Sequence, residues 1–262
     1  MKNKTLKLKT LNPHPRDKNI EFIEKGHLYY VNSKRYEISV TGFVHSFFPK
    51  FKADEIIQKM MMSRNWEQSK YYGMEPEEIK NKWMQNGIEA SKLGTELHKQ
   101  IEDYYNEKEP NQKIETTEYE YFKEFQKDHN KLKPFRTEWE IYDEDLKLAG
   151  SIDMVFQDKQ GNYHLYDWKR SKEIKENNSY EEGHYPLSHI PNANYWHYSL
   201  QLNIYKYILE KNYNIKINDL YIVQFHPNLD KYNKIKCTEL PSEILDMFKD
   251  RYNEISSRES NI

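Results

Sequence analysis

The stretch GSIDMVFQDKQGNYHLYDWK, residues 150–169, decides the fold. Apolar residues surround Asp153, and a Gln-Gly-Asn turn at 160–162 separates this run from a second one that ends in Asp167 and Lys169. Two short runs rich in aromatic and apolar residues on either side of such a turn predict two strands of a meander. Charged side chains are rare inside buried strands unless they are paired or bind a metal. The two acids and the lysine therefore need a structural or chemical reason.

The alternation of side chains along a strand predicts where these charges point. Asp153 shares a face with Ser151 and Val155, and Asp167 points the same way as Lys169. If the two strands are neighbours, the three charged groups converge on one patch. Two close carboxylates repel unless a cation lies between them, and Mg²⁺ prefers oxygen ligands. A bound ion lowers the pKa of water, and a lysine beside it can orient or deprotonate that water or stabilise transition-state charge. The pattern predicts phosphodiester hydrolysis, with a solvated surface ion pair as the alternative interpretation.

The rest of the chain predicts a mixed α/β fold with a central mixed β-sheet flanked by helices. We expect a single domain, 1–262, with a core at about 76–226 and a β-hairpin and helix extension at 20–70. We expect a long helix from Pro76 to about Tyr105, with a kink or break at Gly87 or Gly94 as the alternative. The predicted strands cover 20–40, 135–142, 146–157, 163–169 and 220–225, and the predicted helices cover 53–69, 76–105, 198–212 and the segment after Pro241.

Composition narrows the class of protein. The net charge of -2 excludes a grossly basic nucleic-acid coat but allows a local basic groove. One cysteine, Cys237, cannot form a disulfide or an iron–sulfur cluster, which fits a reducing intracellular compartment. No apolar run approaches the roughly 20 residues of a membrane span. The basic N-terminus, residues 1–16, lacks the apolar core of a secretory signal, and we expect it to be a frayed tail.

Two helical pairs accompany the charged strands. His98 and Glu102 lie four residues apart, so they share a helix face, and both are candidates for metal binding or its support. A surface His–Glu pair is the alternative. Gln201 and Tyr205 have the same spacing on a later helix. They could hold a nucleotide or order the lysine, or belong to an ordinary amphipathic helix.

Taken together, these motifs resemble a known family. The ordered set is G-T-x-x-H at 94–98, G-x-I-D at 150–153, D-W-K at 167–169 and Q-x-x-x-Y at 201–205. It resembles the PD-(D/E)XK nuclease superfamily, and more narrowly its RecB-type exonuclease branch, which includes the mitochondrial genome maintenance exonuclease. The resemblance covers residues 93–206 and implies a restriction-endonuclease-like core. Each motif is weak alone, but four in the right order are a strong joint signal.

The resemblance implies a role for each matching residue. Asp153 and Asp167 would coordinate Mg²⁺ or Mn²⁺, with the main-chain carbonyl of Trp168 as a further ligand. Lys169 would be the catalytic lysine, and His98 would be the extra metal ligand of the RecB-type branch.

The resemblance also implies a supporting motif, and the sequence departs from the family pattern in three ways. Gln201 and Tyr205 would lie behind the active site. Ile152 replaces the proline of the superfamily pattern, and Asp167 replaces glutamate, which shortens the ligand but keeps its charge. The four-cysteine iron–sulfur cluster of some relatives is excluded because the chain has one cysteine.

Further candidates lie near the motifs. Glu138 and Glu140 share a face of the preceding strand, and Glu138 either contributes to the metal site or lies on an exposed face. Arg170 either contacts phosphates or is solvated. In the run NYWHY, Trp196 or Tyr195 either stacks on bases or belongs to the core.

The function expected from the resemblance is a Mg²⁺- or Mn²⁺-dependent deoxyribonuclease. We expect an exonuclease that acts on single-stranded DNA with free ends during replication, repair or recombination. The sequence contains no P-loop motif, so a separate helicase or replication protein would supply unwinding. The alternatives are an RNA or structure-specific endonuclease that uses the same site, and a non-catalytic nucleic-acid-binding protein of the same fold.

Overall fold

The structure, a computed structural model, describes residues 7–108 and 115–260. The chain divides into two compact units, one formed by residues 1–49 and 98–262 and the other by residues 50–97. The first unit contains all of the candidate site residues, and the organisation of 1–262 as one domain stays a prediction. Among the described residues, no helix has both the length and the apolar character that crossing a membrane requires.

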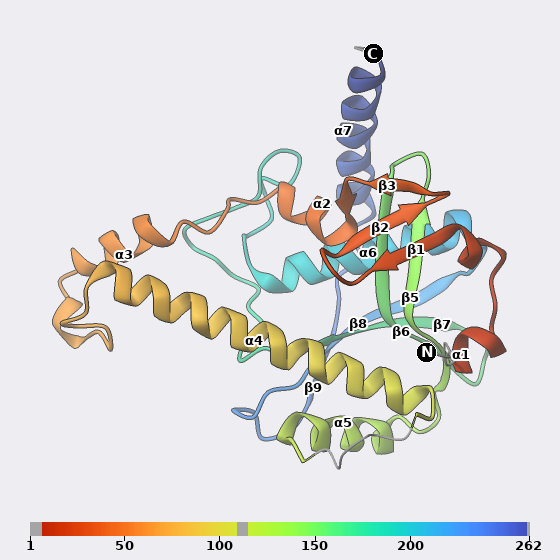
Figure 1. The fold of residues 1–262 in the computed structure, drawn as a ribbon, viewed down its shortest axis with the longest axis horizontal. Coiled ribbons are helices and arrows are strands. Elements are labelled where there is room, and N and C mark those ends of the chain that lie inside the picture. Colours follow the sequence, from red (N-terminus) through yellow and green to blue (C-terminus); the bar gives the residue numbers. More distant parts are fainter. Residues whose placement is uncertain (1–6, 109–114, 261–262) are drawn as a thin grey trace. The chain divides into compact units, whose positions relative to one another are not determined.

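A mixed sheet organises the first unit, as predicted. Within the described residues six strands form it, in the order β4-β6-β7-β8-β9, with β5 paired to β6. β6 runs antiparallel to β5 and β7, whereas β4 is parallel to β6 and β8 is parallel to β7. The meander β5-β6-β7 is confirmed (Figure 1). The strands are β4 (Ile38–Ser39), β5 (Lys133–Asp143), β6 (Leu148–Gln157), β7 (Tyr163–Lys169), β8 (Ile217–Gln224) and β9 (Asn233–Lys236).

Strands β6 and β7 separate at the level of the two acids. Met154 and Tyr166 form the pair nearest that end, so Asp153 and Asp167 lie just beyond the ladder. There the backbone N–H of Trp168 donates a hydrogen bond of 2.7 Å to Asp153 Oδ2. A side-chain carboxylate thus takes the place of a ladder carbonyl, and the strand pair opens where the charged groups gather.

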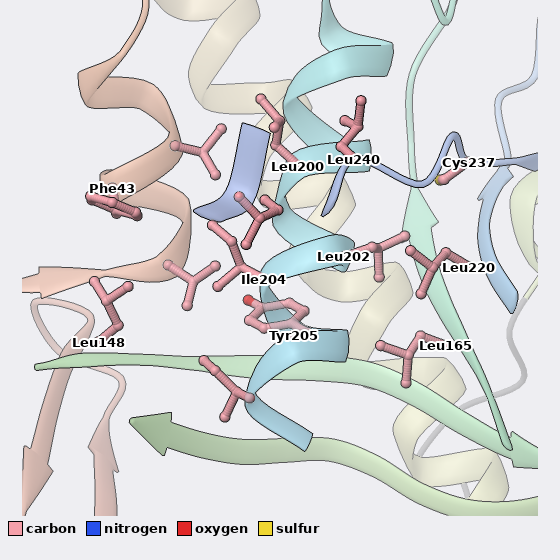
Figure 2. Close-up of a cluster of buried hydrophobic side chains, with 14 of the residues drawn as sticks. Phe43, Leu148, Leu165, Leu200, Leu202, Ile204, Tyr205, Leu220, Cys237 and Leu240 are labelled. Carbon is pink, nitrogen blue, oxygen red and sulfur yellow. The ribbon is translucent and has the colours of Figure 1, made fainter. Parts of the chain in front are cut away.

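Helices cover both faces of the sheet because the strands are buried on both sides. Leu165 of β7 and Leu220 of β8 pack in the cluster around Leu202 of α6, and Phe43 of α2 belongs to the same cluster (Figure 2). The even-numbered Trp168 points to the other face, where its ring centroid lies 5.4 Å from that of Phe125 in α5. Burial of each large apolar side chain contributes roughly 1.5–3 kcal/mol. The helices are α2 (Val40–Ser46), α5 (Thr117–Asp128), α6 (Asn194–Asn212) and α7 (Pro241–Glu259).

A small antiparallel sheet precedes this core. It comprises β1 (Ile20–Ile23), β2 (Leu28–Val31) and β3 (Lys34–Tyr36). Asn32 and Ser33 form the turn between β2 and β3, and both residues have positive φ values, 49° and 64°, as a type I′ turn requires. Tyr29 packs with Tyr142 and Ala149 of the larger sheet.

The N-terminal segment is folded from residue 7 onward, so the expectation of a frayed tail is wrong for residues 7–16. It forms α1 (Lys7–Leu11) and a 3₁₀ turn, Pro15–Asn19. The Asn12 side chain donates a hydrogen bond of 2.8 Å to the Phe135 carbonyl of β5. Arg136, which is buried, pairs with Asp17 at 2.8 Å. These polar contacts, together with buried Leu8, outweigh the cost of ordering a short basic segment. Residues 1–6 lie outside the described residues.

The second unit has its own small core. Ile57 and Tyr71 are buried there, and Trp83 Nε1 donates a hydrogen bond of 2.8 Å to the Tyr71 hydroxyl. The long helix predicted from Pro76 is confirmed, and it continues through both Gly87 and Gly94 without a break. The elements are α3 (Ala53–Met61), a 3₁₀ turn (Trp66–Gln68) and α4 (Pro76–Tyr105), whose last turns, from His98, belong to the first unit.

Candidate active site

A cavity of about 420 Å³ lies in the first unit, where β6 and β7 separate. Charged side chains from the strands and from the end of α4 form one part of its lining, and polar residues of α2 and α6 form another. The β1–β2 turn completes it. The lining residues used below are His27, Tyr29, Thr41, His45, His98, Glu138, Ser151, Asp153, Lys169, Asn194, His197, Tyr198, Gln201 and Tyr205.

Three of these residues present metal-ligating atoms to one point. One ligand atom each from His98, Glu138 and Asp153 lies within 4.8 Å of the others. His98 Nδ1 lies 3.6 Å from Glu138 Oε1 and 3.7 Å from Asp153 Oδ2. The other ring nitrogen of His98, Nε2, lies 2.8 Å from the Trp168 carbonyl oxygen. Because a carbonyl can only accept, Nε2 carries the proton of this hydrogen bond.

The electrostatics of this group indicate an excess of negative charge. Burial lowers the pKa of His98, but the carboxylates of Asp153 and Glu138 outweigh burial and raise this pKa to about 9. Burial raises the pKa of Asp153, although the positive charges of His98 and Lys169 oppose that rise. The cluster therefore favours a cation, whether an imidazolium or a bound metal ion.

Asp167 and Lys169 form an ion pair beside the cluster. Lys169 Nζ lies 2.7 Å from Asp167 Oδ2 and 4.8 Å from the centroid of the Tyr198 ring. Burial raises the pKa of Asp167 to about 6, and repulsion by Asp153 adds to this rise. Burial lowers the pKa of Lys169, but Asp167 and Asp153 raise it above its usual range, so the ammonium is charged at neutral pH. The converging charges predicted from alternation are therefore present.

Gln201 and Tyr205 lie behind these groups on α6. Gln201 Nε2 donates a hydrogen bond of 3.2 Å to Asp167 Oδ1, and its Oε1 accepts one of 3.3 Å from Thr41. Gln201 thus orients the acid and not the lysine. Tyr205 is buried against Gly150, where an added Cβ would lie 2.7 Å from the Tyr205 hydroxyl oxygen. The glycine of the G-x-I-D motif gives this tyrosine its space.

Gly150→Ala is expected to destabilise the protein by about 1–3 kcal/mol, the usual cost of overpacking a close contact. The added methyl would push Tyr205, and with it the turn of α6 that carries Gln201. Chemical denaturation measures the change. Gly87→Ala is the control, because no atom lies within 4 Å of its Cβ position. Equal unfolding free energies for Gly150→Ala and wild type would contradict the packing role.

Glu138 has an unusual backbone conformation for a residue inside a strand. Its φ of 44° lies in the left-handed region, which costs a residue with a side chain on the order of 1–3 kcal/mol. Its Oε2 accepts a hydrogen bond of 3.2 Å from Ser151 Oγ, and its Oε1 faces His98. The strained backbone thus directs this carboxylate at the cluster. This placement favours participation in the site over the exposed strand face.

Two other predicted residues have different partners. Glu102 lies 2.7 Å from Lys99 Nζ, and its carboxylate does not belong to the ligand cluster found among the described residues. Arg170 Nε donates a hydrogen bond of 2.7 Å to Glu118 Oε1. Both charges are held in ion pairs outside the cluster. The spacing of Lys99 and Glu102 along a helix could have indicated the first pair, whereas Arg170 and Glu118 lie far apart in the sequence.

The aromatic run places a different ring in the cavity from the one predicted. Trp196 packs against the buried core, and its indole N–H donates a hydrogen bond of 2.7 Å to the Glu176 carbonyl. Tyr195 is buried. Among the described lining residues, the ring that this run contributes beside Lys169 is that of Tyr198.

Further lining residues were not identified from the sequence. Asn194, His197 and Tyr198 continue the face of Gln201 and Tyr205 toward the start of α6, at spacings of three or four residues. Extending the Q-x-x-x-Y spacing backward would have found them. His45 comes from α2, and its ring centroid lies 5.4 Å from that of His197. No short-range pattern links these two histidines, because they lie far apart in the sequence.

The donor set fits a divalent metal ion. Carboxylate oxygens suit Mg²⁺ and Mn²⁺, and an imidazole nitrogen favours a transition metal over Mg²⁺. His98, Glu138 and Asp153 are close enough for one ion to contact all three after small adjustments. If Nε2 is to bind the ion, its hydrogen bond to the Trp168 carbonyl must be given up, whereas the carbonyl oxygen has a second lone pair and can bind an ion without losing that bond.

The comparisons with known proteins identify a family for this chain. A family model described as the PD-(D/E)XK nuclease superfamily matches residues 61–260, more than half of the chain. A solved structure described as "Crystal structure of SSO0001" is 14% identical, covers 82% of this chain and 73% of that one, and has a TM-score of 0.30. The search of curated proteins gave no significant match.

Proposed function

The chain belongs to the PD-(D/E)XK nuclease superfamily, and from its site we propose a metal-dependent deoxyribonuclease that degrades single-stranded DNA from free ends. Members of this superfamily are generally nucleases and use divalent metal ions. The observation that carries the proposal is the convergence of His98, Glu138 and Asp153 beside the Asp167–Lys169 pair. The presence of His98, from the G-T-x-x-H motif, in this cluster supports the further proposal of a RecB-type nuclease.

Each residue has a proposed role in hydrolysis. His98, Glu138 and Asp153 would hold the ion, with Asp167 and the Trp168 carbonyl as further ligands. A bound ion would lower the pKa of the attacking water and offset the negative charge that develops on the phosphoryl oxygens as the water oxygen bonds to phosphorus. The Lys169 ammonium stabilises the same charge, and the proton of the water ends on the leaving oxygen as the phosphorus–oxygen ester bond breaks. Gln201 orients Asp167 for this work.

Glu138→Gln is expected to weaken Mn²⁺ binding by about 10- to 100-fold, an effect typical of polar residues around metal centres. The substitution keeps the size of the side chain and removes one negative charge from the cluster. Isothermal titration with Mn²⁺ measures the affinity. The matched control is Glu140→Gln, on the same strand but paired with Lys9 and not with the cluster. Unchanged affinity in Glu138→Gln would exclude Glu138 from the metal site, both as a ligand and as a supporting residue.

The proposed substrate follows from the dimensions of the cavity. A volume of about 420 Å³ is that of a small-molecule pocket and is room for about one nucleotide, which supports a strand that enters the site one nucleotide at a time. Tyr198, which is only partly buried, offers a ring for a base. In this proposal a separate helicase or replication protein opens duplex DNA, because the sequence contains no P-loop motif of its own. Such activity would serve replication, repair or recombination.

A single digestion experiment separates the candidate functions. Labelled linear single-stranded DNA, the same DNA as a closed circle, and labelled RNA are incubated with Mg²⁺ or Mn²⁺. The proposal predicts degradation of the linear DNA alone, with at least equal activity in Mn²⁺. Cutting of circles would show an endonuclease, preferred cutting of RNA would show a ribonuclease, and binding without cleavage would show a non-catalytic protein.

A further inference from the structure

A second cavity, of about 560 Å³, lies at the other end of strand β2 from the candidate active site. Cationic side chains dominate it, although the whole chain has a net charge of -2. The charged lining consists of Lys34, Arg35, Lys147, Arg251 and Arg258 against Glu37 and Glu144, that is, five positive and two negative charges for a net of +3.

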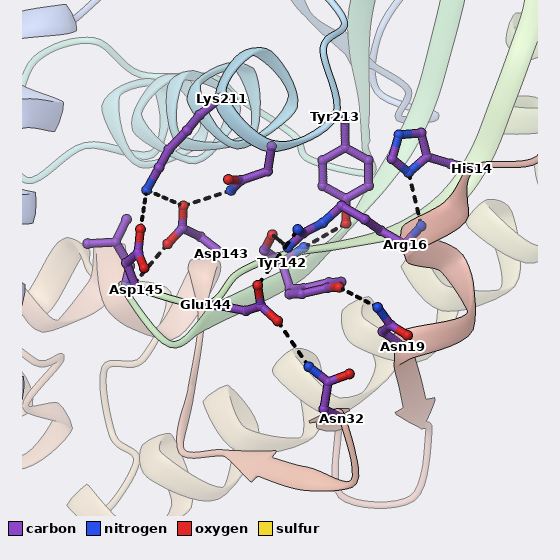
Figure 3. A network of polar contacts seen from close by, with 12 residues as sticks. His14, Arg16, Asn19, Asn32, Tyr142, Asp143, Glu144, Asp145, Lys211 and Tyr213 are labelled. Carbon is purple, nitrogen blue, oxygen red and sulfur yellow. Dashed lines mark hydrogen bonds and ion pairs between the residues drawn. The ribbon is translucent and has the colours of Figure 1, made fainter.

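The acids of this cavity are already neutralised. Glu144 accepts a hydrogen bond of 3.0 Å from Asn32 Nδ2 and lies 3.8 Å from Arg16 (Figure 3). Glu37 pairs with Arg258 at 2.5 Å. Lys34 and Arg35, by contrast, are exposed and have no ion-pair partner among the residues that the structure describes. Two cations at the mouth of the cavity are therefore free to bind an anion.

The cavity also has an apolar part and lies near the cleavage site. Tyr36, Val31 and Ile255 contribute apolar surface, and Tyr36 offers an aromatic ring. Val31 lines this cavity, whereas Tyr29, two residues earlier on β2, lines the candidate active site. Two strand residues span about 7 Å. A surface with cations beside an aromatic ring can bind the phosphate and the base of a nucleotide together.

We propose that this cavity binds the phosphate and base of a nucleotide, as part of the substrate strand beyond the cleavage site. Lys34 and Arg35 hold phosphates, and Tyr36 contacts a base. Strand β2 then connects the two nucleotide sites, so a strand held here is positioned with respect to the cleavage site. The choice of the strand as the source of the nucleotide rests on the proposed function, whereas the phosphate chemistry does not. A free nucleotide released by cleavage has the same chemistry and is the other source.

Binding in EDTA tests the proposal without requiring cleavage. Fluorescein-labelled oligothymidylate is titrated with the full chain over a range of salt concentrations, and a gel confirms that the probe stays intact. Lys34→Glu/Arg35→Glu is expected to weaken binding at least tenfold. The slope of log affinity against log salt should fall by about 1.4, since each lost phosphate contact on a single strand contributes about 0.7. Lys34→Ala/Arg35→Ala should act in the same direction, with a smaller loss.

The control is Lys131→Glu/Lys159→Glu, which makes the same charge change at exposed positions outside the cavity. If both glutamate double variants lose affinity and slope equally, the proposal is overturned.

A competition experiment with thymidine monophosphate then identifies whether the bound nucleotide is part of a strand or free. If thymidine monophosphate displaces a labelled mononucleotide from wild type while strand binding is unaffected in the variants, the cavity holds free nucleotide. A loss of strand binding without mononucleotide binding assigns the cavity to the strand. Failure of the nuclease proposal would leave these binding results unchanged.

Discussion

Lys169→Ala is expected to lower the rate of DNA cleavage by about 10³-fold or more, because a charged group at the transition state and proton transfer each contribute factors of 10²–10⁴. The ammonium lies at the site where β6 and β7 separate, 2.7 Å from Asp167. Single-turnover digestion of end-labelled single-stranded DNA measures the rate. Unfolding is a small risk, because the pKa of Asp167 is already raised to about 6, so its carboxyl group can take up a proton when its partner is removed.

Lys169→Arg distinguishes two roles for this residue. Arginine keeps the positive charge but cannot give up a proton at working pH. Because Asp167 and Asp153 keep the Lys169 ammonium charged, we expect the arginine variant to retain more activity than the alanine variant. Equal loss in the two variants would contradict the electrostatic role and indicate that Lys169 must transfer a proton.

Asp17→Asn is expected to lower the free energy of unfolding at pH 7 by about 3–5 kcal/mol, the usual cost of leaving one member of a buried ion pair alone. Arg136 is buried, and the Asp17 carboxylate lies 2.8 Å from it and also accepts a hydrogen bond of 2.9 Å from Trp139 Nε1. The pair joins the N-terminal segment to β5. Chemical denaturation measures the effect, with Glu120→Gln as the control because its partner Lys123 is exposed and the expected loss is below about 1 kcal/mol.

The pH dependence of this effect has a definite sign. Burial raises the pKa of Asp17, but Arg136 and the N–H groups of His14 and Trp139 outweigh burial and lower it below its usual value. A lowered pKa stabilises the fold above the unfolded value of about 4, and this stabilisation is lost as pH falls through the folded value. The difference between wild type and Asp17→Asn should therefore shrink in acid. A difference that stays constant between pH 7 and pH 3 would show that the carboxylate charge is not the cause.

Much of the site could be predicted because its elements are local. Alternation along two strands placed Asp153, Asp167 and Lys169 together, and a spacing of four residues placed Gln201 and Tyr205 on one helix face. The order of the motifs along the chain then predicted that His98, 55 positions before Asp153 in the sequence, belongs to the same site. The structure brings these residues together around the separation of β6 and β7.

The other features of the fold and the site could not be predicted, because they depend on contacts that local sequence patterns do not encode. The N-terminal segment looked like a solvated tail because the buried partner of Asp17, Arg136, lies on a distant strand. Arg170 was a candidate for phosphate binding because Glu118 lies on another element. The direction of the Glu138 carboxylate depends on a left-handed backbone that glutamate rarely adopts.

The central claim is that His98, Glu138 and Asp153 form the metal centre of a nuclease. Its most direct test is digestion of end-labelled single-stranded DNA by wild type and by Asp153→Asn, in Mn²⁺, in Mg²⁺ and in EDTA. The account predicts degradation by wild type with either ion, none in EDTA, and none by Asp153→Asn under any condition. Undiminished degradation by Asp153→Asn, or by wild type in EDTA, would contradict it.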